Sequence, residues 1–338
     1  MSYKLRLCTE HISREISAGG LVPAFKSFEE DLCEGTVRGL DVDQFSSLSE
    51  WVSWLKWSSV VLDENDYLKA AVQALRLAPK MAGTDYGTSR QRDLGQLWAD
   101  TIRGFLGEIA FAKWLKERYG ISAELDYRRG PLEEFLPSDI KSVNGRPPRL
   151  KISVKTTKFG GVWLDVPGAQ IKHSDVYVLV RVGITRDHLL AFFKKISVFK
   201  DKFFKEALER GIAGKDELEE IWGSLPEFAH VPAYVAGFLD KAEIADFLND
   251  EKSIILVDGE VKIKKVIINK FLGYWHPAVP DYERKVREKL KSQGKSIRDD
   301  MKIEFVGIQN FSKELHFLAS SGVLKRKQEE WEKVITKL

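Results

Sequence analysis

The run DVYVLVRVGI, residues 175–184, constrains the fold of this chain more than any other segment. Its residues are apolar at nearly every position instead of at every second one, which predicts a central β-strand that is covered on both faces. Such a strand requires neighbouring strands and packed helices. The middle of the chain is therefore expected to be an α/β or α+β unit, with one sheet and helices packed on it.

Changes of pattern divide the 338 residues into three regions, and a chain of this length is expected to form about two to three compact units. Residues 1–95 are predicted to be helical, residues 96–250 to form a mixed core, and residues 251–338 to form an α+β extension. A polar stretch that contains Arg90 and Arg92 precedes the core, and we interpret both arginines as solvated.

The apolar spacing also predicts individual elements. SLSEWVSWLKW has apolar residues at helical spacing after a serine cap, and residues 67–77 give a second such pattern. The remaining helices are expected at residues 97–118, 198–222 (a charged insertion), 241–248 and 282–293. Strands are expected at residues 138–143, 150–157, 162–166, 175–184, 189–195, 233–239 and 302–308, with one or two more within residues 261–275.

Composition limits the class of protein. The chain is 43% hydrophobic and has neither an apolar run near about 18 residues nor a signal-peptide pattern, so we expect a soluble cytoplasmic protein without a membrane partner. Two cysteines and six histidines without paired spacing are too few for a disulfide framework or a cysteine-type zinc site. Any metal must be held by oxygen ligands. A net charge of +3 permits an anionic partner without demanding one.

The segment LKISVKTTKF combines the alternation of a strand with central lysines. Ile152, Val154 and Thr156 are expected on one face and Ser153 and Lys155 on the other. A lysine in the middle of such a strand is costly to bury unless an anionic group neutralises it. The pattern therefore predicts carboxylates close to Lys155.

Two carboxylates are candidates for this role. Asp139, in PSDIKSV, opens the preceding strand, and antiparallel pairing through the turn NGRPPR would bring it near Ser153 and Lys155. Glu108, in GFLGEIAFAKWL, lies on an apolar stripe of the helix at residues 97–118. A glutamate in that position is expected to have a partner.

Two acids, a lysine and a serine in one place favour Mg²⁺-assisted phosphodiester hydrolysis. Carboxylates and water hold Mg²⁺, while a lysine beside the phosphate orients the attacking water. The structural alternative is a buried ion pair between Lys155 and Asp139, with Glu108 at the edge of its helix.

The order of these motifs resembles the core of the PD-(D/E)XK nuclease superfamily, the fold of many type II restriction endonucleases. GE on a helix, SD opening a strand, SVKTT on the next strand and IKHSDVYVLV on a later one occur within residues 96–250. The resemblance implies a restriction-endonuclease-like central mixed sheet flanked by helices. It also implies a hydrolase, namely a site-specific double-stranded DNA endonuclease of a restriction-modification system.

The resemblance implies further properties. Mg²⁺ is the expected cofactor, Mn²⁺ is able to substitute for it, and no nucleotide cofactor is expected. A homodimer is expected because the cutting of both strands of a symmetric DNA site calls for two active sites.

Carried over to this chain, the family pattern assigns roles to four residues. Asp139 corresponds to the metal-binding acid, Lys155 to the catalytic lysine, and Glu108 to the helix glutamate that many members add. Ser153 departs from the pattern because the family usually has Glu or Asp at this position. Some restriction enzymes of this superfamily have Ser-Val-Lys here and recruit an acid from elsewhere.

Three acids are candidates for the missing metal ligand. Glu108 is the first and Asp165, in VWLDVP, is the second. Asp165 also fits a solvent-facing position at the edge of a sheet. Asp175 is the third candidate, although a short acid before a strand more often caps a turn.

Contacts with DNA are expected from lysines around the motif. Lys141, Lys151 and Lys158 are candidates for sequence-independent phosphate contacts, and Gln170 and Lys172 lie in a loop that could approach DNA. Base recognition or dimerisation would fall to the N-terminal region and to the C-terminal extension, because both exceed what a nuclease core requires.

Several aromatic residues have two interpretations. Trp51, Trp54 and Trp57 have the spacing of a helix, which favours core packing or a dimer contact over stacking on single-stranded bases. His276, in GYWHPA, is interpreted as structural.

Two other functions remain open from the sequence. One is a repair or defence nuclease of the same superfamily that recognises DNA structure or single strands. The other is a DNA-binding protein whose nuclease-like core is inactive, which the serine at position 153 favours.

Overall fold

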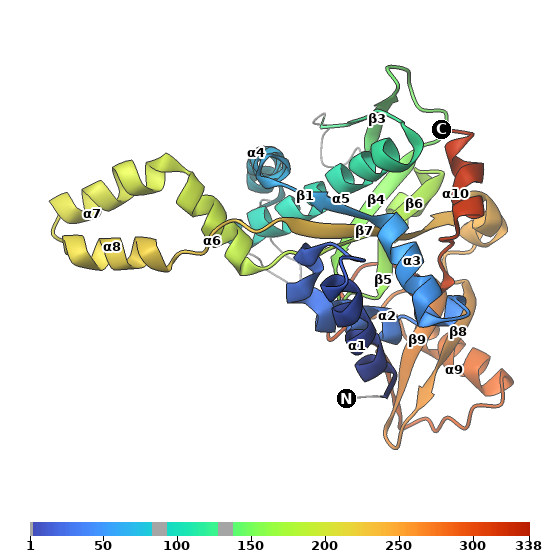
Figure 1. Cartoon of the computed structure of the whole chain (residues 1–338). Coiled ribbons are helices and arrows are strands. Elements are labelled where there is room, and N and C mark those ends of the chain that lie inside the picture. The colour runs from blue at the N-terminus through green and yellow to red at the C-terminus, as the bar shows by residue number, and fades with distance from the viewer. Residues whose placement is uncertain (1–2, 83–92, 128–137) are drawn as a thin grey trace.

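The computed structural model describes residues 3–82, 93–127 and 138–338, and it has a mixed α+β fold (Figure 1). The α+β class predicted from the sequence is therefore confirmed. Arg90 and Arg92 lie outside the described residues. None of the helices within those ranges combines the length and the apolar character needed to cross a bilayer.

The N-terminal region is helical, as predicted, and one short strand was not predicted. The helix α3 begins after Ser47, whose hydroxyl accepts a hydrogen bond from the backbone N–H of Glu50 at 3.1 Å, which confirms the serine cap. Trp51 and Trp54 are buried, so they are core residues. The elements are α1 (Tyr3–Ser17), η1 (Pro23–Phe28), α2 (Glu29–Arg38), η2 (Val42–Gln44), α3 (Leu48–Ser58), β1 (Ser59–Leu62) and α4 (Glu64–Ala82).

The main sheet has the strand order β1–β7–β6–β4. Its strands β4 (Ile152–Lys158) and β6 (Val176–Val182) run parallel, and β7 (Val231–Asp240) runs antiparallel to both β6 and β1. Every residue of β6 is buried, which confirms the central strand predicted from its continuous apolar run.

Both faces of this sheet are covered. On one face, Val178 and its alternate neighbours pack with α4 and with α5 (Leu94–Tyr119). On the other face, Tyr177 and Leu179 join a cluster that contains residues of α1 to α3 and of the C-terminal part of the chain. Because both clusters combine residues from different regions, the region boundaries at 95 and 250 stay predictions.

A second sheet has the order β10–β9–β11–β5, with β8 paired to β9. The strand β5 comes from the centre of the chain, and the other four come from its C-terminal part. The two regions therefore share one sheet. The elements are β5 (Trp163–Pro167), β8 (Ile254–Val261), β9 (Lys265–Trp275), α9 (Pro280–Ser292), β10 (Lys302–Phe305) and β11 (His316–Ser320).

The hairpin predicted between residues 138–143 and 150–157 does not form as a ladder. The strand β3 (Ile140–Val143) pairs with β2 (Ala123–Leu125) and not with β4. Asn144 and Gly145 have positive φ angles of 49° and 77° and reverse the chain at once. Pro147 and Pro148 then follow, and neither has the N–H that a ladder needs. A single backbone hydrogen bond, from Asp139 N–H to the Ile152 carbonyl at 2.8 Å, joins the two segments.

The strand predicted at residues 189–195 is wrong, because this segment belongs to the helix α6 (Arg186–Lys195). The hydroxyl of Thr185 accepts a hydrogen bond from the N–H of Asp187 at 3.2 Å and caps the helix. The apolar run LLAFF is too short for its periodicity to distinguish a helix from a strand. The N-cap at Thr185 is the feature that favours the helix.

A helical arm interrupts the main sheet between β6 and β7. It follows α6 and projects from the body, at the left of Figure 1. The predicted charged helical insertion is confirmed. The arm contains the π-helical turn η4 (Phe199–Phe204), α7 (Lys205–Glu209) and α8 (Lys215–Ser224), and the other short elements of the chain are η3 (Gly168–Lys172), η5 (Lys241–Asn249), η6 (Ser321–Val323) and α10 (Gln328–Ile335).

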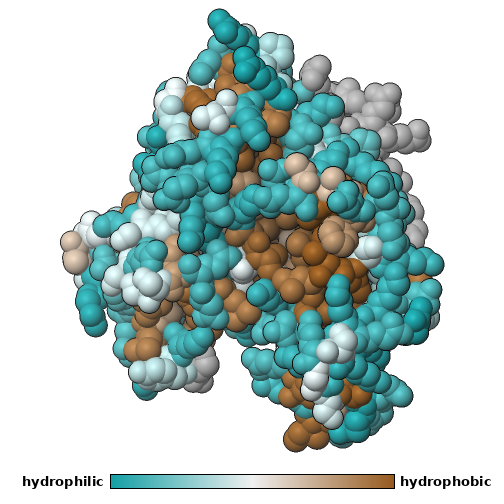
Figure 2. All heavy atoms as spheres, turned by 90° about the vertical axis from the view of Figure 1, so that its right-hand side faces the viewer, coloured by the Kyte–Doolittle hydropathy of each residue, from teal (hydrophilic) through white to brown (hydrophobic). Residues whose placement is uncertain are grey.

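The face on the right-hand side of Figure 1, where α10 lies, has apolar residues gathered in a central hollow with a hydrophilic rim (Figure 2). Separately, a cavity of about 510 Å³ lies between η5, α10 and the start of β6. Its walls include Val176, Phe238 and Val334, together with Lys325 and Lys333. The cavity is therefore lined by both apolar side chains and lysines.

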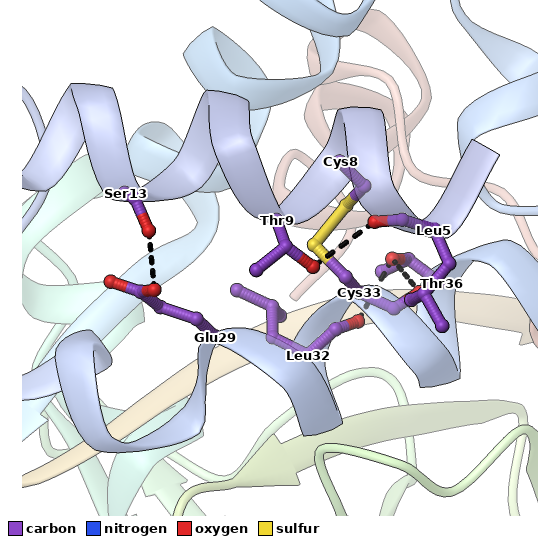
Figure 3. The surroundings of a disulfide bond; sticks show 8 residues. All are labelled: Leu5, Cys8, Thr9, Ser13, Glu29, Leu32, Cys33 and Thr36. Carbon is purple, nitrogen blue, oxygen red and sulfur yellow. Dashed lines mark hydrogen bonds between the residues drawn. A yellow bond between two sulfur atoms is a disulfide. The ribbon is translucent and has the colours of Figure 1, made fainter. Parts of the chain in front are cut away.

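A disulfide bond joins α1 to α2 through Cys8 and Cys33 (Figure 3). Both cysteines are fully buried. Thr9 and Thr36, on the same two helices, donate hydrogen bonds to the carbonyls of Leu5 and Leu32 in the preceding turns. Two cysteines are too few for a disulfide framework, but a single covalent bond fixes how these two helices pack.

A buried ion network links three distant parts of the chain. Arg181 of β6 donates to the carboxylate of Asp41 at 2.7 Å, and Arg326 lies 3.3 Å from the other oxygen of Asp41. All three side chains have no exposed surface. Arg181 also donates to Ser321 at 2.9 Å and to Tyr234 at 2.6 Å.

We expect Asp41→Asn to lower the free energy of unfolding by roughly 3–5 kcal/mol, because it leaves two buried guanidinium groups without their counter-charge. Denaturation in guanidinium chloride measures the change. The control is Asp43→Asn, which removes an exposed 3.0 Å ion pair with Lys4 and is expected to cost less than about 1 kcal/mol. Equal losses in the two variants would contradict the role of the network.

Reduction of the Cys8–Cys33 bond is expected to lower the free energy of unfolding by about 3 kcal/mol. The bond closes a loop with a sequence separation of 25, and loss of the crosslink increases the entropy of the unfolded chain. The measurement compares thermal or chemical denaturation with and without dithiothreitol. The double variant Cys8→Ala/Cys33→Ala serves as a control whose stability does not respond to the reductant.

Candidate functional site

Asp139 is anchored to β4 by both its backbone and its side chain. Its N–H donates to the Ile152 carbonyl at 2.8 Å, and its carboxylate accepts a hydrogen bond from the N–H of Val154 at 2.5 Å. The hydroxyl of Ser153 forms a further hydrogen bond with the same carboxylate. The expected closeness of Asp139 to the SVK segment is present, although a side-chain contact produces it instead of a β-ladder.

Glu108 reaches the same place because α5 lies very close to β4. A Cβ atom on Gly107 would be only 1.9 Å from the hydroxyl oxygen of Thr156. That hydroxyl donates to the carbonyl of Gly104, one turn earlier in α5, at 3.2 Å. The glycine at position 107 therefore allows the helix to approach the strand, and the next residue carries its carboxylate towards Asp139.

Glu108 and Asp139 both have raised pKa values. Burial raises the pKa of Glu108 well above its usual range, repulsion by Asp139 raises it further, and Lys155 offsets part of the shift. Burial also raises the pKa of Asp139, and Lys155 and the N–H of Val154 oppose this effect without cancelling it. The positive charge around the two carboxylates is therefore too small to stabilise both of them in the ionised form.

Asp126 is a further acid of this cluster that the sequence did not indicate. It follows β2, is 7% exposed, and donates its backbone N–H to the Asp139 carbonyl at 2.9 Å. Its charge contributes to the raised pKa values of Glu108 and Asp139. In the sequence AELDYRR, Asp126 has no distinguishing spacing, and only the pairing of β2 with β3 brings it to the site.

Lys155 points from β4 towards η3. Its ammonium group donates a hydrogen bond to the side-chain oxygen of Gln170 at 2.9 Å. Gln170 is itself held by the hydroxyl of Tyr177, which donates to its backbone carbonyl at 2.9 Å. Gln170, which was expected in a loop that could approach DNA, lies in η3 and contacts the lysine of the motif.

The remaining lysines of the motif differ in their surroundings. Lys158 and Lys151 are exposed at the two ends of β4, where they are accessible to a polyanion. Lys141 forms a 2.7 Å ion pair with Glu124 on the protein surface. Lys172 forms a 3.2 Å ion pair with Glu251, so its charge is shared with an acid.

Asp165 and Asp175 are engaged elsewhere. Asp165 of β5 lies 2.9 Å from Nδ1 of His316 on β11, in the second sheet. Asp175 accepts a hydrogen bond from the N–H of Lys151 at 2.9 Å. This contact joins the starts of β4 and β6, and it is not the local turn cap that was considered for Asp175. Asp126, and not Asp165, is the additional acid beside Glu108 and Asp139. His276 accepts a hydrogen bond from the N–H of Ala278 at 3.2 Å, as expected of a structural histidine.

The donor set fits an oxygen-preferring cation. As the side chains lie, the described residues contain no group of three His, Cys, Asp or Glu side chains that could hold a metal ion. Mg²⁺, however, is commonly bound by one or two carboxylates, with water and substrate phosphates as its other ligands. Glu108 and Asp139 repel each other, and a divalent cation between them would relieve this repulsion.

Comparisons with known proteins provide no family assignment. No protein-family model matches the chain, and neither curated proteins nor solved structures yield a match.

The Asp165–His316 pair predicts a pH-dependent contribution to stability. Burial lowers the pKa of His316, but the hydrogen bond and charge of Asp165 outweigh burial and raise it overall. A raised folded-state pKa means that the pair stabilises the fold fully below the unfolded value of about 6.5, and that this stabilisation is lost as the pH rises through the folded-state pKa.

Asp165→Asn is therefore expected to destabilise the protein more at pH 5.5 than at pH 9. Urea denaturation of both proteins at the two pH values measures the difference. A loss that is independent of pH would show that His316 is not charged in the folded protein.

Proposed function

We propose that this protein is a Mg²⁺-dependent endonuclease that hydrolyses phosphodiester bonds in double-stranded DNA, with a core related to the PD-(D/E)XK nucleases. The observation that carries the proposal is the convergence of Glu108, Asp139 and Lys155. Glu108 comes from α5, Asp139 from the position just before β3, and Lys155 from β4. The segments occur in the motif order of the family, and the motif strand β4 lies beside the buried strand β6.

Glu108 and Asp139 are the residues that would hold the metal. When bound, Mg²⁺ supplies Lewis-acid stabilisation of the negative charge that develops on the scissile phosphate. The backbone N–H of Val154 and the hydroxyl of Ser153 fix the orientation of the Asp139 carboxylate. Ser153, which is 8% exposed, thus orients the first acid, while Glu108 supplies the second carboxylate that the family pattern requires.

Lys155 is the group that acts on the attacking water. Its ammonium group lowers the pKa of both acids, which burial raises, and it is held in place through Gln170. A positioned ammonium group orients the water by hydrogen bonding and stabilises charge on the phosphate. A lysine in the middle of this strand is accommodated by its hydrogen bond to Gln170 and by the charges of the two acids that it influences.

Duplex DNA is the substrate that fits the surroundings of this site. The exposed residues Lys158, at the end of β4, and Lys151, just before its start, are available for phosphate contacts, which are independent of base sequence. We propose recognition of a short symmetric site by a homodimer, as in restriction-modification systems, and a cytoplasmic location. Mn²⁺ is expected to replace Mg²⁺.

A DNA-binding protein with an inactive core is the second candidate, and Ser153 at the usual acidic position favours it. Such a protein would bind DNA without cutting it. It would also show no dependence of Mg²⁺ or Mn²⁺ binding on Glu108 and Asp139, which titration calorimetry measures directly on the wild type and on Glu108→Gln.

The test of the proposal is incubation of the protein with unmethylated phage DNA and Mg²⁺, followed by gel electrophoresis. Discrete fragments are expected from the wild type. Lys155→Ala is expected to lower the cleavage rate by roughly 10²–10⁴-fold, with duplex binding largely retained in a mobility-shift assay. Asp139→Asn and Glu108→Gln are expected to abolish cleavage, because each removes a carboxylate of the proposed metal site.

Asp165→Asn is the matched control for these variants, because it removes a carboxylate that is paired with His316, and it is expected to leave cleavage unchanged. A smear in place of discrete fragments would indicate a nuclease with little sequence preference. Intact DNA in all lanes, together with metal binding that ignores Glu108, would contradict the proposal and support the inactive DNA-binding protein.

A further inference from the structure

The arm, residues 198–224, is a helical hairpin that stands away from the rest of the molecule. It is inserted between β6 and β7 and projects from the body at the left of Figure 1. Its first limb, residues 198–210, contains η4 and α7, and its second limb, residues 211–224, contains α8. The proposed nuclease chemistry uses none of these residues.

Large apolar side chains on the arm are exposed. Phe203 is 62% exposed and Ile212 is 72% exposed, and Val198, Leu208 and Ile221 each keep more than two fifths of their surface accessible. Single exposed apolar residues are ordinary, but several on one small projection are typical of an interaction surface. The arm therefore has more apolar surface than its own packing uses.

The two limbs of the arm pack against each other, so the arm is a folded hairpin. Phe204 of the first limb lies edge-on to Trp222 of the second, with ring centroids 5.8 Å apart. Lys200 lies over the same tryptophan at 5.3 Å, and Leu218 of α8 is buried. The two limbs are thus joined to each other, while Phe203 and Ile212 face outward.

The charge of the arm is divided between its limbs. The first limb has four basic and three acidic residues, a net charge of +1, and the second has one basic and four acidic residues, a net charge of −3. The sum, −2, is unfavourable for a surface that binds the phosphates of DNA. Lys202 on the first limb and Glu217 and Glu220 on the second form no ion pair with any residue in the described part of the chain.

We propose that the arm is a self-association surface, and that its partner is the arm of a second copy of this chain. In a twofold-symmetric contact, residue i of one copy meets residue j of the other, and j meets i. The basic limb of each copy then lies against the acidic limb of its partner, twice. Two helical hairpins that bury their apolar faces against each other form a four-helix arrangement, which covers Phe203 and Ile212.

This pairing does not depend on the nuclease proposal, and it leaves the Glu108–Asp139–Lys155 cluster outside the contact. It identifies the surface through which two copies of the chain would associate. If the nuclease proposal also holds, the two arms connect two active sites, which is what cleavage of both strands requires.

Sedimentation velocity on the whole chain tests the arm. The wild type is expected to sediment as a dimer, at twice the chain mass of 38.5 kDa, over a concentration range of about 1–100 µM. Phe203→Glu/Ile212→Glu is expected to raise the dimer dissociation constant at least about a hundredfold, because it places charges in the apolar contact. Because both side chains are exposed in the single chain, the variant is expected to keep the circular dichroism spectrum of the folded wild type, while its melting temperature loses the dependence on protein concentration that dimerisation confers.

The matched control is Ile263→Glu, at the turn between β8 and β9, where the side chain is 84% exposed. It removes an equally exposed apolar residue outside the arm and is expected to leave the dimer intact. A wild type that is monomeric throughout this range, or a dimer that survives the arm variant, overturns the proposal. Loss of DNA binding in the arm variant without any change in oligomeric state overturns it as well and assigns the arm to DNA.

A charge exchange tests the arrangement of the limbs. Lys202→Glu alone and Glu217→Lys/Glu220→Lys alone are each expected to weaken the dimer at least about tenfold, because each places like charges in contact. An equal mixture of the two proteins is expected to recover the wild-type dimer, since opposite charges then meet at both contacts. Failure of the mixture to associate overturns the twofold pairing of basic and acidic limbs.

Discussion

One buried aspartate lies between two buried arginines, and the packing of the whole chain depends on this contact. Asp41, Arg181 and Arg326 come from the helical N-terminus, the central strand β6 and the C-terminal segment. Burial of a charge is costly unless a counter-charge accompanies it. Burial of Arg181 in the central sheet is therefore unfavourable in free energy unless Asp41 of the N-terminal region packs beside it.

The network has one positive charge in excess, and aromatic groups stabilise it. The Arg326 guanidinium lies 5.3 Å from the ring of Trp54, and that of Arg181 lies 5.8 Å from the ring of Tyr234. Burial lowers the pKa of Arg181, but Tyr234 and Asp41 outweigh this effect and raise it overall. The N-terminal region, the core and the C-terminal extension, which the sequence pattern separates, are in this way joined by one network of buried charges.

The sheet that this network supports also determines the geometry of the candidate site. Because β4 lies beside the fully buried β6, its backbone presents the N–H of Val154 to Asp139 in a fixed position. Gly107 allows α5 to lie against β4, so Glu108 comes close enough to Asp139 for the two charges to repel each other. The resulting shortage of positive charge is the physical basis on which a divalent cation is proposed for this site.

The sequence by itself determined the buried central strand, the alternation that separates Lys155 from its apolar neighbours, and the placement of Glu108 on an apolar helix stripe. These inferences depend on local periodicity, which side-chain burial enforces. The sequence did not determine that Asp139 approaches β4 without forming a β-ladder. Pro147 and Pro148 lack the N–H groups that a ladder needs, and the path of the chain through this turn depends on the tertiary structure. Nor did the sequence reveal Asp126 or the partner of Asp41. Both depend on contacts between residues far apart in the chain, and only the tertiary structure decides which distant charges must share one buried space.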